Sequence, residues 1–141
     1  LRTKEDIKAL ITGLKDGTID AICSDHTPED IENKQCEFDH SAFGMINLQT
    51  SFSAANTAIK NKLDLAEFIS KVTSSPRKIL GLEKIEITVG EKANLTLFSP
   101  TEKWTINKED IVSKSKNTPF IGKELTGKVY GIINNNKIEL V

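Results

Sequence analysis

The feature that most constrains the fold is an amphipathic helix followed at once by a short apolar segment. Thr3 and Asp6 have the spacing of a capping box, apolar residues then recur at helical intervals up to Leu14, and Gly17 can end the helix in the left-handed conformation. Residues 19–24 are mostly apolar, which predicts a buried strand. A helix that leads directly into such a strand is half of the repeat that builds parallel sheets. One strand cannot close a sheet, so we expect its neighbours to lie outside this sequence.

The hydrophobic pattern changes after Gly81. Before it, helical spacing returns over residues 48–59 and 64–72, and Pro76 can open a further short helix. After it, the alternation typical of strands is found at 85–89, 94–98, 102–106, 128–133 and 137–141. The three asparagines at 134–136 suit a hairpin turn, because asparagine tolerates a positive φ. The sequence therefore predicts α/β structure for residues 1–81 and mainly β structure for residues 82–141.

Composition excludes several classes of partner. Lys and Arg number 19 and Asp and Glu number 20, for a formal charge of -1, so the basic surplus that binds nucleic acid or anionic membranes is absent. No apolar run approaches the ~20 residues of a membrane span. Cys23 and Cys36 match no common zinc pattern, and unpaired thiols favour a cytoplasmic location. The chain opens at Leu1 and its only methionine is Met45, so we expect a fragment or a processed product.

The sharpest local signal for chemistry is Asp25, which directly follows the predicted strand 19–24. The carboxyl ends of parallel strands are where α/β barrels assemble their active sites. A carboxylate there can ligate a divalent metal and can take a proton from metal-bound water. The alternative is that Asp25 only caps the following turn, a common use of this residue. The polar stretch 27–40 has the length of a functional loop, and we expect it to form part of the wall around the substrate.

Five segments, taken in order, resemble the dihydroorotase family. They are DAICSDHTP (20–28), AFGM (42–45), SSPRKILG (74–81), GEKANLTLF (90–98) and SKSKNTPF (113–120). The chain is similar to the C-terminal portion of a long, bacterial-type dihydroorotase, within the cyclic amidohydrolase superfamily. The resemblance implies a C-terminal fragment of a metal-dependent (β/α)₈ hydrolase barrel, over residues 1–81, joined to part of a small β-sandwich, over residues 82–141.

The same resemblance implies roles for three residues. Asp25 matches the family's aspartate that ligates zinc and moves a proton during catalysis. Phe43 and Gly44 match the Phe-Gly pair whose backbone holds the pyrimidine ring. The implied reaction is the reversible cyclisation of N-carbamoyl-L-aspartate to dihydroorotate, in pyrimidine biosynthesis. The family's other metal ligands are histidines and a lysine from earlier strands, and the only histidines here are His26 and His40. We therefore expect this chain alone to hold no tight zinc and to be inactive.

One residue departs from the family pattern. Such enzymes carry a histidine that helps to hold the substrate where this chain has Glu29. A carboxylate at that place should repel an anionic substrate. This leaves open a non-catalytic relative that acts as a structural partner of aspartate carbamoyltransferase. A hydantoinase- or allantoinase-type cyclic amidohydrolase is a further alternative. A homo-oligomer is expected in either case, because a partial barrel exposes sheet edges and helix faces. We expect His26 to order the loop after Asp25 or to cap the strand.

Overall fold

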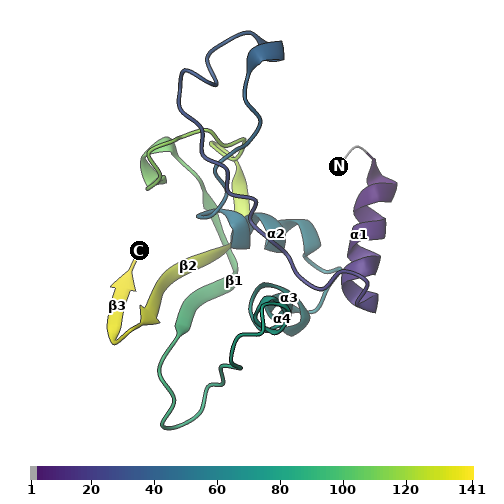
Figure 1. Cartoon of the computed structure of the whole chain (residues 1–141), viewed down its shortest axis with the longest axis vertical. Coiled ribbons are helices and arrows are strands. Elements are labelled where there is room, and N and C mark those ends of the chain that lie inside the picture. The colour runs from purple at the N-terminus through teal and green to yellow at the C-terminus, as the bar shows by residue number, and fades with distance from the viewer. Residues whose placement is uncertain (1–2) are drawn as a thin grey trace.

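The structure is a computed structural model, and it describes residues 3–141. Figure 1 shows helices and strands that occupy separate parts of the chain. The α-helices are α1 (Lys4–Asp16), α2 (Ser51–Ile59), α3 (Leu65–Val72) and α4 (Ser74–Ile79). The strands are β1 (Leu95–Thr105), β2 (Glu124–Asn134) and β3 (Lys137–Leu140), and the short 3₁₀ turns are η1 (Phe38–His40) and η2 (Lys108–Asp110).

The three strands form one antiparallel sheet in the order β1-β2-β3. Two predicted strands, 94–98 and 102–106, merge into β1, which pairs with β2 through two irregularities in register. The predicted hairpin between β2 and β3 is confirmed, because Asn135 and Asn136 have φ values of 49° and 60°. A positive φ at both turn residues matches the right-handed twist of the paired strands.

The core lies where α2 packs against this sheet. Ile46, Ile106, Ile111 and Leu125 form a buried apolar cluster with the Trp104 ring packed against it. Polar side chains of α2 reach the strand backbone as well. Asn56 Nδ2 donates to the carbonyls of Pro100 and Thr126, at 3.0 and 2.9 Å, and Ser53 Oγ donates to the carbonyl of Gly127. These bonds satisfy strand carbonyls that the packed helix would otherwise leave without water.

Helix α1 forms as predicted. Thr3 and Asp6 make the capping box, and Gly17 ends the helix with a φ of 82°. Its apolar face is only partly covered, however, because Leu14 is buried whereas Ile7 and Leu10 are exposed.

Two predicted strands are wrong. Residues 85–89 form no strand within the described part of the chain, and the side chains of Ile87 and Val89 are exposed. Residues 19–24 are also not a strand in the structure, and helices hold them instead. The Ile22 N–H donates to the carbonyl of Lys71 at 3.0 Å, and Lys71 Nζ donates to the carbonyl of Ile19 at 2.8 Å. The physical reason is the same in both cases: a strand requires a neighbouring strand to bond with, and no other described segment pairs with either.

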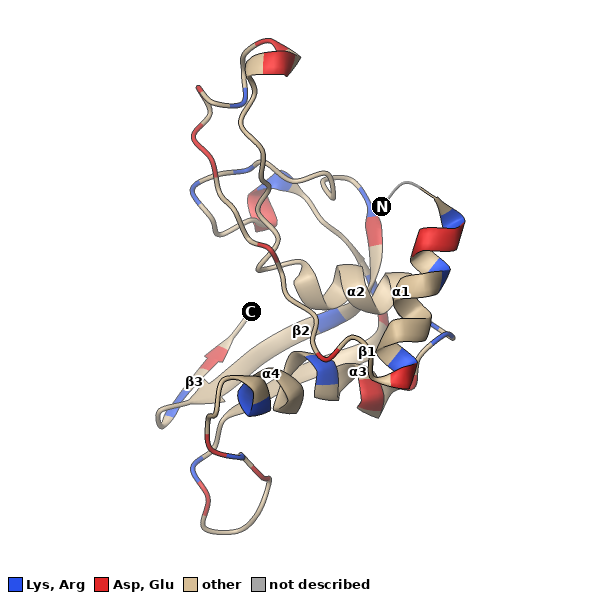
Figure 2. Cartoon of the chain, turned by 45° about the vertical axis from the view of Figure 1, so that its right-hand side comes forward, with Lys and Arg blue, Asp and Glu red and all other residues tan. Residues whose placement is uncertain are grey.

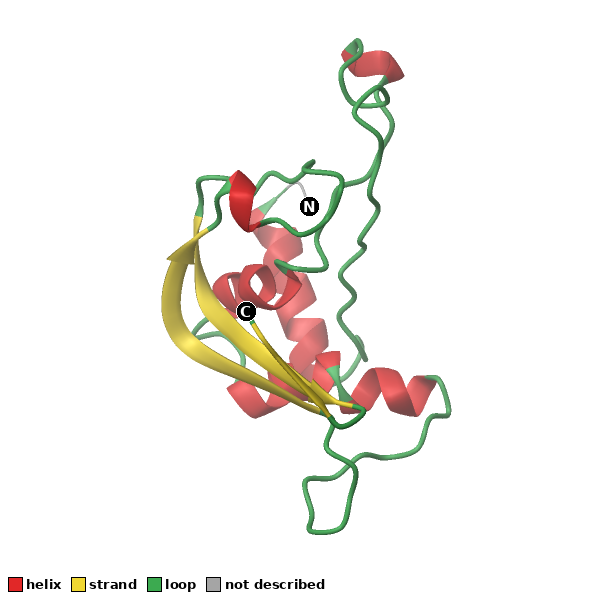
Figure 3. Cartoon of the chain, turned by 90° about the vertical axis from the view of Figure 1, so that its left-hand side faces the viewer, coloured by secondary structure: helices red, strands yellow, loops and turns green. Residues whose placement is uncertain are grey.

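Two loops project from opposite ends of the molecule, as Figure 3 shows: the loop that carries η1 and the connection 82–94 between α4 and β1. Charges of both signs are interspersed over the helices and loops (Figure 2), in keeping with the formal charge of -1. Within residues 3–141, no helix is long and apolar enough to cross a membrane.

Candidate functional site

Asp25 stands at the end of the segment 19–24 in a backbone conformation that few residues other than glycine adopt. Its φ is 49°, which costs an ordinary residue about 1–2 kcal/mol and is better tolerated by Asp. The side chain is exposed, and no hydrogen bond or ion pair with residues 3–141 engages its carboxylate. No backbone N–H donates to it, so the turn-capping alternative finds no support. The carboxylate is available to a ligand.

His26 joins the Asp25 segment to a second segment, residues 45–48. Its Nδ1 accepts the N–H groups of Asn47 and Leu48, each at 3.0 Å. Asn47 Nδ2 in turn donates to the carbonyl of Ser24 at 2.8 Å. The expectation that His26 orders the loop is confirmed. Both backbone donors point to Nδ1, so the ring edge that carries this nitrogen is engaged within the chain.

Phe43 and Gly44 lie on a turn that leads into the second segment. The Phe43 side chain is 96% exposed. Gly44 has a φ of 118°, and a Cβ added to it would stand 2.8 Å from both Thr27 Cγ2 and the Thr27 carbonyl oxygen. No other residue fits there without moving the backbone. The Thr27 N–H donates to the carbonyl of Met45 at 2.9 Å, so the turn is held against the residues that follow Asp25.

The structure thus brings all three predicted site residues onto two adjoining segments, with Thr27 between them. Sequence reasoning missed two residues that contact the turn. Lys34 Nζ and Asn117 Nδ2 both donate to the carbonyl of Gly44, each at 2.8 Å. Asn117 belongs to the SKSKNTPF segment, so the resemblance had pointed to it without a role. Nothing in the local pattern around Lys34 distinguishes it from an ordinary exposed lysine.

Glu29 is half-buried in the loop that begins after His26. Its Oε2 accepts a hydrogen bond from Asn33 Nδ2 at 3.3 Å, four residues further along. No cation pairs with Glu29 among the described residues, and Glu29 follows Asp25 by four residues in the chain. This is the position at which the resemblance led us to expect a histidine.

The described residues do not form a metal centre by themselves. No group of three or more His, Cys, Asp and Glu side chains within 3–141 is placed to hold an ion. A tight zinc site requires three or four protein ligands. Asp25 is free to supply one carboxylate, and the remaining ligands would have to come from other polypeptide.

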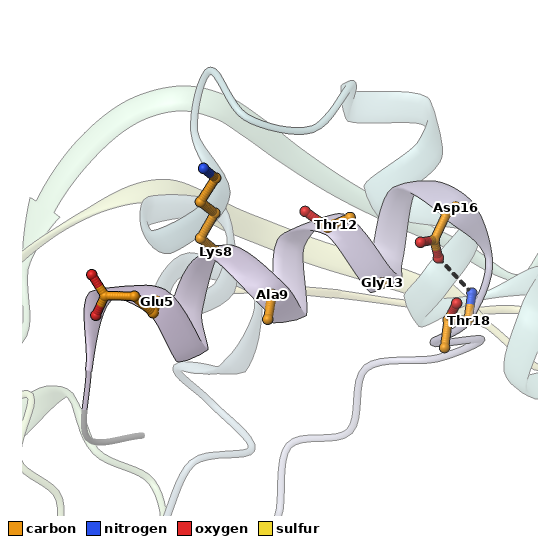
Figure 4. Close-up of a pocket in the computed structure, with 7 residues that line it drawn as sticks. All are labelled: Glu5, Lys8, Ala9, Thr12, Gly13, Asp16 and Thr18. Atoms are coloured by element: carbon orange, nitrogen blue, oxygen red, sulfur yellow. Dashed lines mark hydrogen bonds between the residues drawn. The ribbon is translucent and has the colours of Figure 1, made fainter.

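The larger of two surface hollows among the described residues does not contain the predicted site residues Asp25, Phe43 and Gly44. A hollow of about 440 Å³ runs along α1, and Figure 4 shows its lining, which includes Ala9, Gly13 and Asp16. The Thr18 side chain, and secondarily the Thr18 N–H, which donates to Asp16 Oδ1 at 2.9 Å, lower the pKa of the Asp16 carboxyl. The lining contains no thiol or imidazole. A much smaller cavity of about 20 Å³, beside His26 and Ile46, has room for about one water molecule.

Comparison with known sequences gives a consistent result. The family model described as the amidohydrolase family matches residues 1–138. The chain is 44% identical over 140 residues to a dihydroorotase of Chlorobaculum tepidum and 45% identical over 140 residues to one of Caldicellulosiruptor saccharolyticus. These alignments cover 98% of this chain but only 32% and 33% of the relatives. The chain therefore spans about a third of the length of the curated relatives it matches.

Solved structures share the fold. The dihydropyrimidinase of Brevibacillus agri superposes with a TM-score of 0.86 at 25% identity, over 99% of this chain and 32% of that one. The inactive dihydroorotase-like domain of a Chaetomium thermophilum CAD-like multifunctional protein superposes with a TM-score of 0.67, over 98% of this chain and 36% of that one. At 19% identity, the second likeness concerns the fold alone. The chain has the mixed α/β fold of these structures.

Proposed function

The chain belongs to the amidohydrolase family, and from this premise we propose that it is part of a dihydroorotase. The intact enzyme would interconvert N-carbamoyl-L-aspartate and dihydroorotate, with loss of water on ring closure. The observation that supports this most strongly is that Thr27 holds the segment carrying the free Asp25 carboxylate against the turn that carries Phe43 and Gly44. Identities of 42–45% to proteins named dihydroorotase support the same reaction.

In this proposal Asp25 both binds metal and moves a proton. Its carboxylate is exposed and makes no bond within residues 3–141, so both oxygens can serve these roles. A zinc ion, when bound, supplies an activated water at neutral pH. The backbone of Phe43 and Gly44 would hold the ring of the substrate. We also propose that residues 1–81 belong to a (β/α)₈ barrel and residues 82–141 to a β-sandwich, in a cytoplasmic homo-oligomer.

The decisive experiment replaces Asp25 in the intact protein. Asp25→Asn keeps the shape of the side chain but removes its charge and its ability to accept a proton. We expect kcat for dihydroorotate hydrolysis to fall by about 10²–10⁴-fold, with bound zinc reduced as measured by metal analysis. Asp30→Asn is the matched control, since Asp30 is an exposed carboxyl on the same loop, and it should leave both quantities unchanged. Normal turnover by Asp25→Asn would overturn the assignment.

Glu29 favours a second candidate, a non-catalytic dihydroorotase-like partner of aspartate carbamoyltransferase. Glu29 follows Asp25 by four residues in the chain, and its carboxylate has no cation partner among the described residues. In an active enzyme, Glu29→His should lower KM for dihydroorotate, because it removes repulsion and adds a donor. An intact protein that contains no zinc, and that binds the carbamoyltransferase in a pull-down assay, would instead support the second candidate.

A third candidate is a hydantoinase- or allantoinase-type enzyme, since a dihydropyrimidinase shares the fold at 25% identity. The higher identity to dihydroorotases argues for the first candidate. Turnover of dihydroorotate, hydantoin and allantoin by the intact protein, compared at equal concentration, separates the three reactions.

A further inference from the structure

The carbonyl of Gly44 is held by two side chains that come from distant parts of the chain. Lys34 Nζ donates to it from the η1 loop and Asn117 Nδ2 donates to it from the segment before β2, both at 2.8 Å. Lys34 Nζ also donates to the carbonyl of Ala42. One ammonium group therefore fixes the two carbonyls on either side of Phe43.

The backbone beyond the turn is fixed as well. The Ile46 N–H donates to the carbonyl of Asn117 at 2.8 Å, so Asn117 bonds to the turn through both its side chain and its main chain. Thr27 lies against Gly44 on the remaining side, where no Cβ would fit. Three separate segments thus determine the orientation of the peptide planes at Phe43 and Gly44.

Between the fixed carbonyls of Ala42 and Gly44, backbone groups of Phe43 and Gly44 have no hydrogen-bond partner among the described residues. Within residues 3–141, neither the N–H nor the carbonyl of Phe43 takes part in a hydrogen bond, and the N–H of Gly44 also has no partner. A donor and an acceptor held in one orientation and open to a ligand suit a planar cyclic amide, which presents the complementary pair.

We infer that Lys34 and Asn117 are positioning residues that orient the free backbone groups of Phe43 and Gly44 toward the substrate. This rests on the proposed function, in which these groups hold the ring. Lys34 adds a charge effect. It is half-buried and forms no ion pair among the described residues, so its positive charge remains at the turn and attracts a carboxylate-bearing substrate.

Kinetics of the intact protein test the inference. Lys34→Met keeps the aliphatic stem and removes the donors and the charge, so we expect KM for dihydroorotate to rise about tenfold while kcat changes less than about threefold. Asn117→Ala should raise KM in the same direction. Lys34→Arg, which keeps charge and donors, should restore KM to within about threefold of the unmodified enzyme. Gln35→Met is the matched control, since Gln35 is exposed on the same loop, and its KM should be unchanged.

A purely structural role predicts a different pattern: a lower melting temperature with kcat and KM unaltered, or kcat and KM altered equally by Lys34→Met and Lys34→Arg. Either pattern overturns the inference. Hydrogen exchange of the Thr27 and Ile46 amides gives a readout independent of catalysis. Lys34→Met and Asn117→Ala should speed it, and Gln35→Met should not. If the unmodified protein does not act on dihydroorotate, the proposed function fails. In that case hydrogen exchange alone tests whether Lys34 and Asn117 orient the turn. Unchanged exchange rates in Lys34→Met and Asn117→Ala would reject that role.

Discussion

Two regions of the molecule are held together by different forces. The helix–sheet core is centred on α2, which packs against β2 and meets α3 and β1 through aromatic rings. It is built mainly on apolar contact, supplemented by the buried hydrogen bonds of Ser53 and Asn56. Phe52 stacks on Phe68, with ring centroids 5.7 Å apart, and meets Phe98 edge-on at 4.9 Å. The site loops, residues 24–48, are held mainly by hydrogen bonds from His26, Lys34 and other polar side chains to the backbone.

The two regions differ in how far they bury their apolar side chains. Phe68 in the core is 1% exposed, whereas Phe38 and Phe43 in the site loops are 94% and 96% exposed. Burial of apolar area stabilises a fold without regard to direction, whereas hydrogen bonds are directional and fix the orientation of a few groups. The core therefore provides most of the stability, and the site loops fix the orientation of a few backbone groups. The exposed rings of Phe38 and Phe43 remain open to a ligand or to further polypeptide.

The largest expected effect is a difference in unfolding free energy between substitutions at two phenylalanines, Phe68 and Phe43. Phe68→Ala should lower the free energy of unfolding by about 3–5 kcal/mol, because it leaves a cavity in a packed site. Phe43→Ala should change it by less than about 0.5 kcal/mol, since that ring makes little contact in the described structure. Urea unfolding of both variants measures the difference. Equal losses would mean that Phe43 is covered in the intact protein, and the contrast between core and loops would disappear.

A smaller effect tests whether the site loops unfold together with the core. Gly44→Ala places a methyl group 2.8 Å from Thr27, and we expect a loss of about 2 kcal/mol in unfolding free energy. Gly17→Ala is the matched control: its φ is also positive, but nothing lies within 4 Å, so only about 1 kcal/mol should be lost. If Gly44→Ala costs no more than the control, the site loops open independently of the core.

The smallest effect lies on the outer part of the sheet, where Tyr130 and Lys128 both contact Glu102. The hydrogen bond from the Tyr130 hydroxyl, and secondarily Lys128, lowers the pKa of the Glu102 carboxyl. A carboxyl with a lowered pKa contributes stability that is present above its ordinary value of 4.5 and is lost as the pH falls through the lowered folded value. Glu102→Gln should therefore flatten the loss of stability in acid, measured by thermal unfolding between neutral pH and the acid range. Glu109→Gln, a change at an exposed carboxyl, should not.

Local features of the fold were predictable because neighbouring residues carry them. The capping box of Thr3 and Asp6, the left-handed end of α1 at Gly17 and the turn at Asn135 and Asn136 each depend on a few consecutive positions. The strands at 19–24 and 85–89 were predicted wrongly because an apolar run or an alternating pattern indicates only a segment that can pair, and pairing depends on a partner strand. For the same reason, the apolar positions of α1 predicted its amphipathic face but not that Ile7 and Leu10 would remain exposed.

The amino-acid sequence by itself determined the family, the β character of the chain after residue 93 with its final hairpin, and the candidate residues Asp25, Phe43 and Gly44, because side-chain type and short-range spacing carry that information. Only the tertiary structure decided that Lys34 and Asn117 meet at the carbonyl of Gly44, 10 and 73 residues away along the chain. Contacts of that kind arise from chain reversal and packing, which no local pattern specifies.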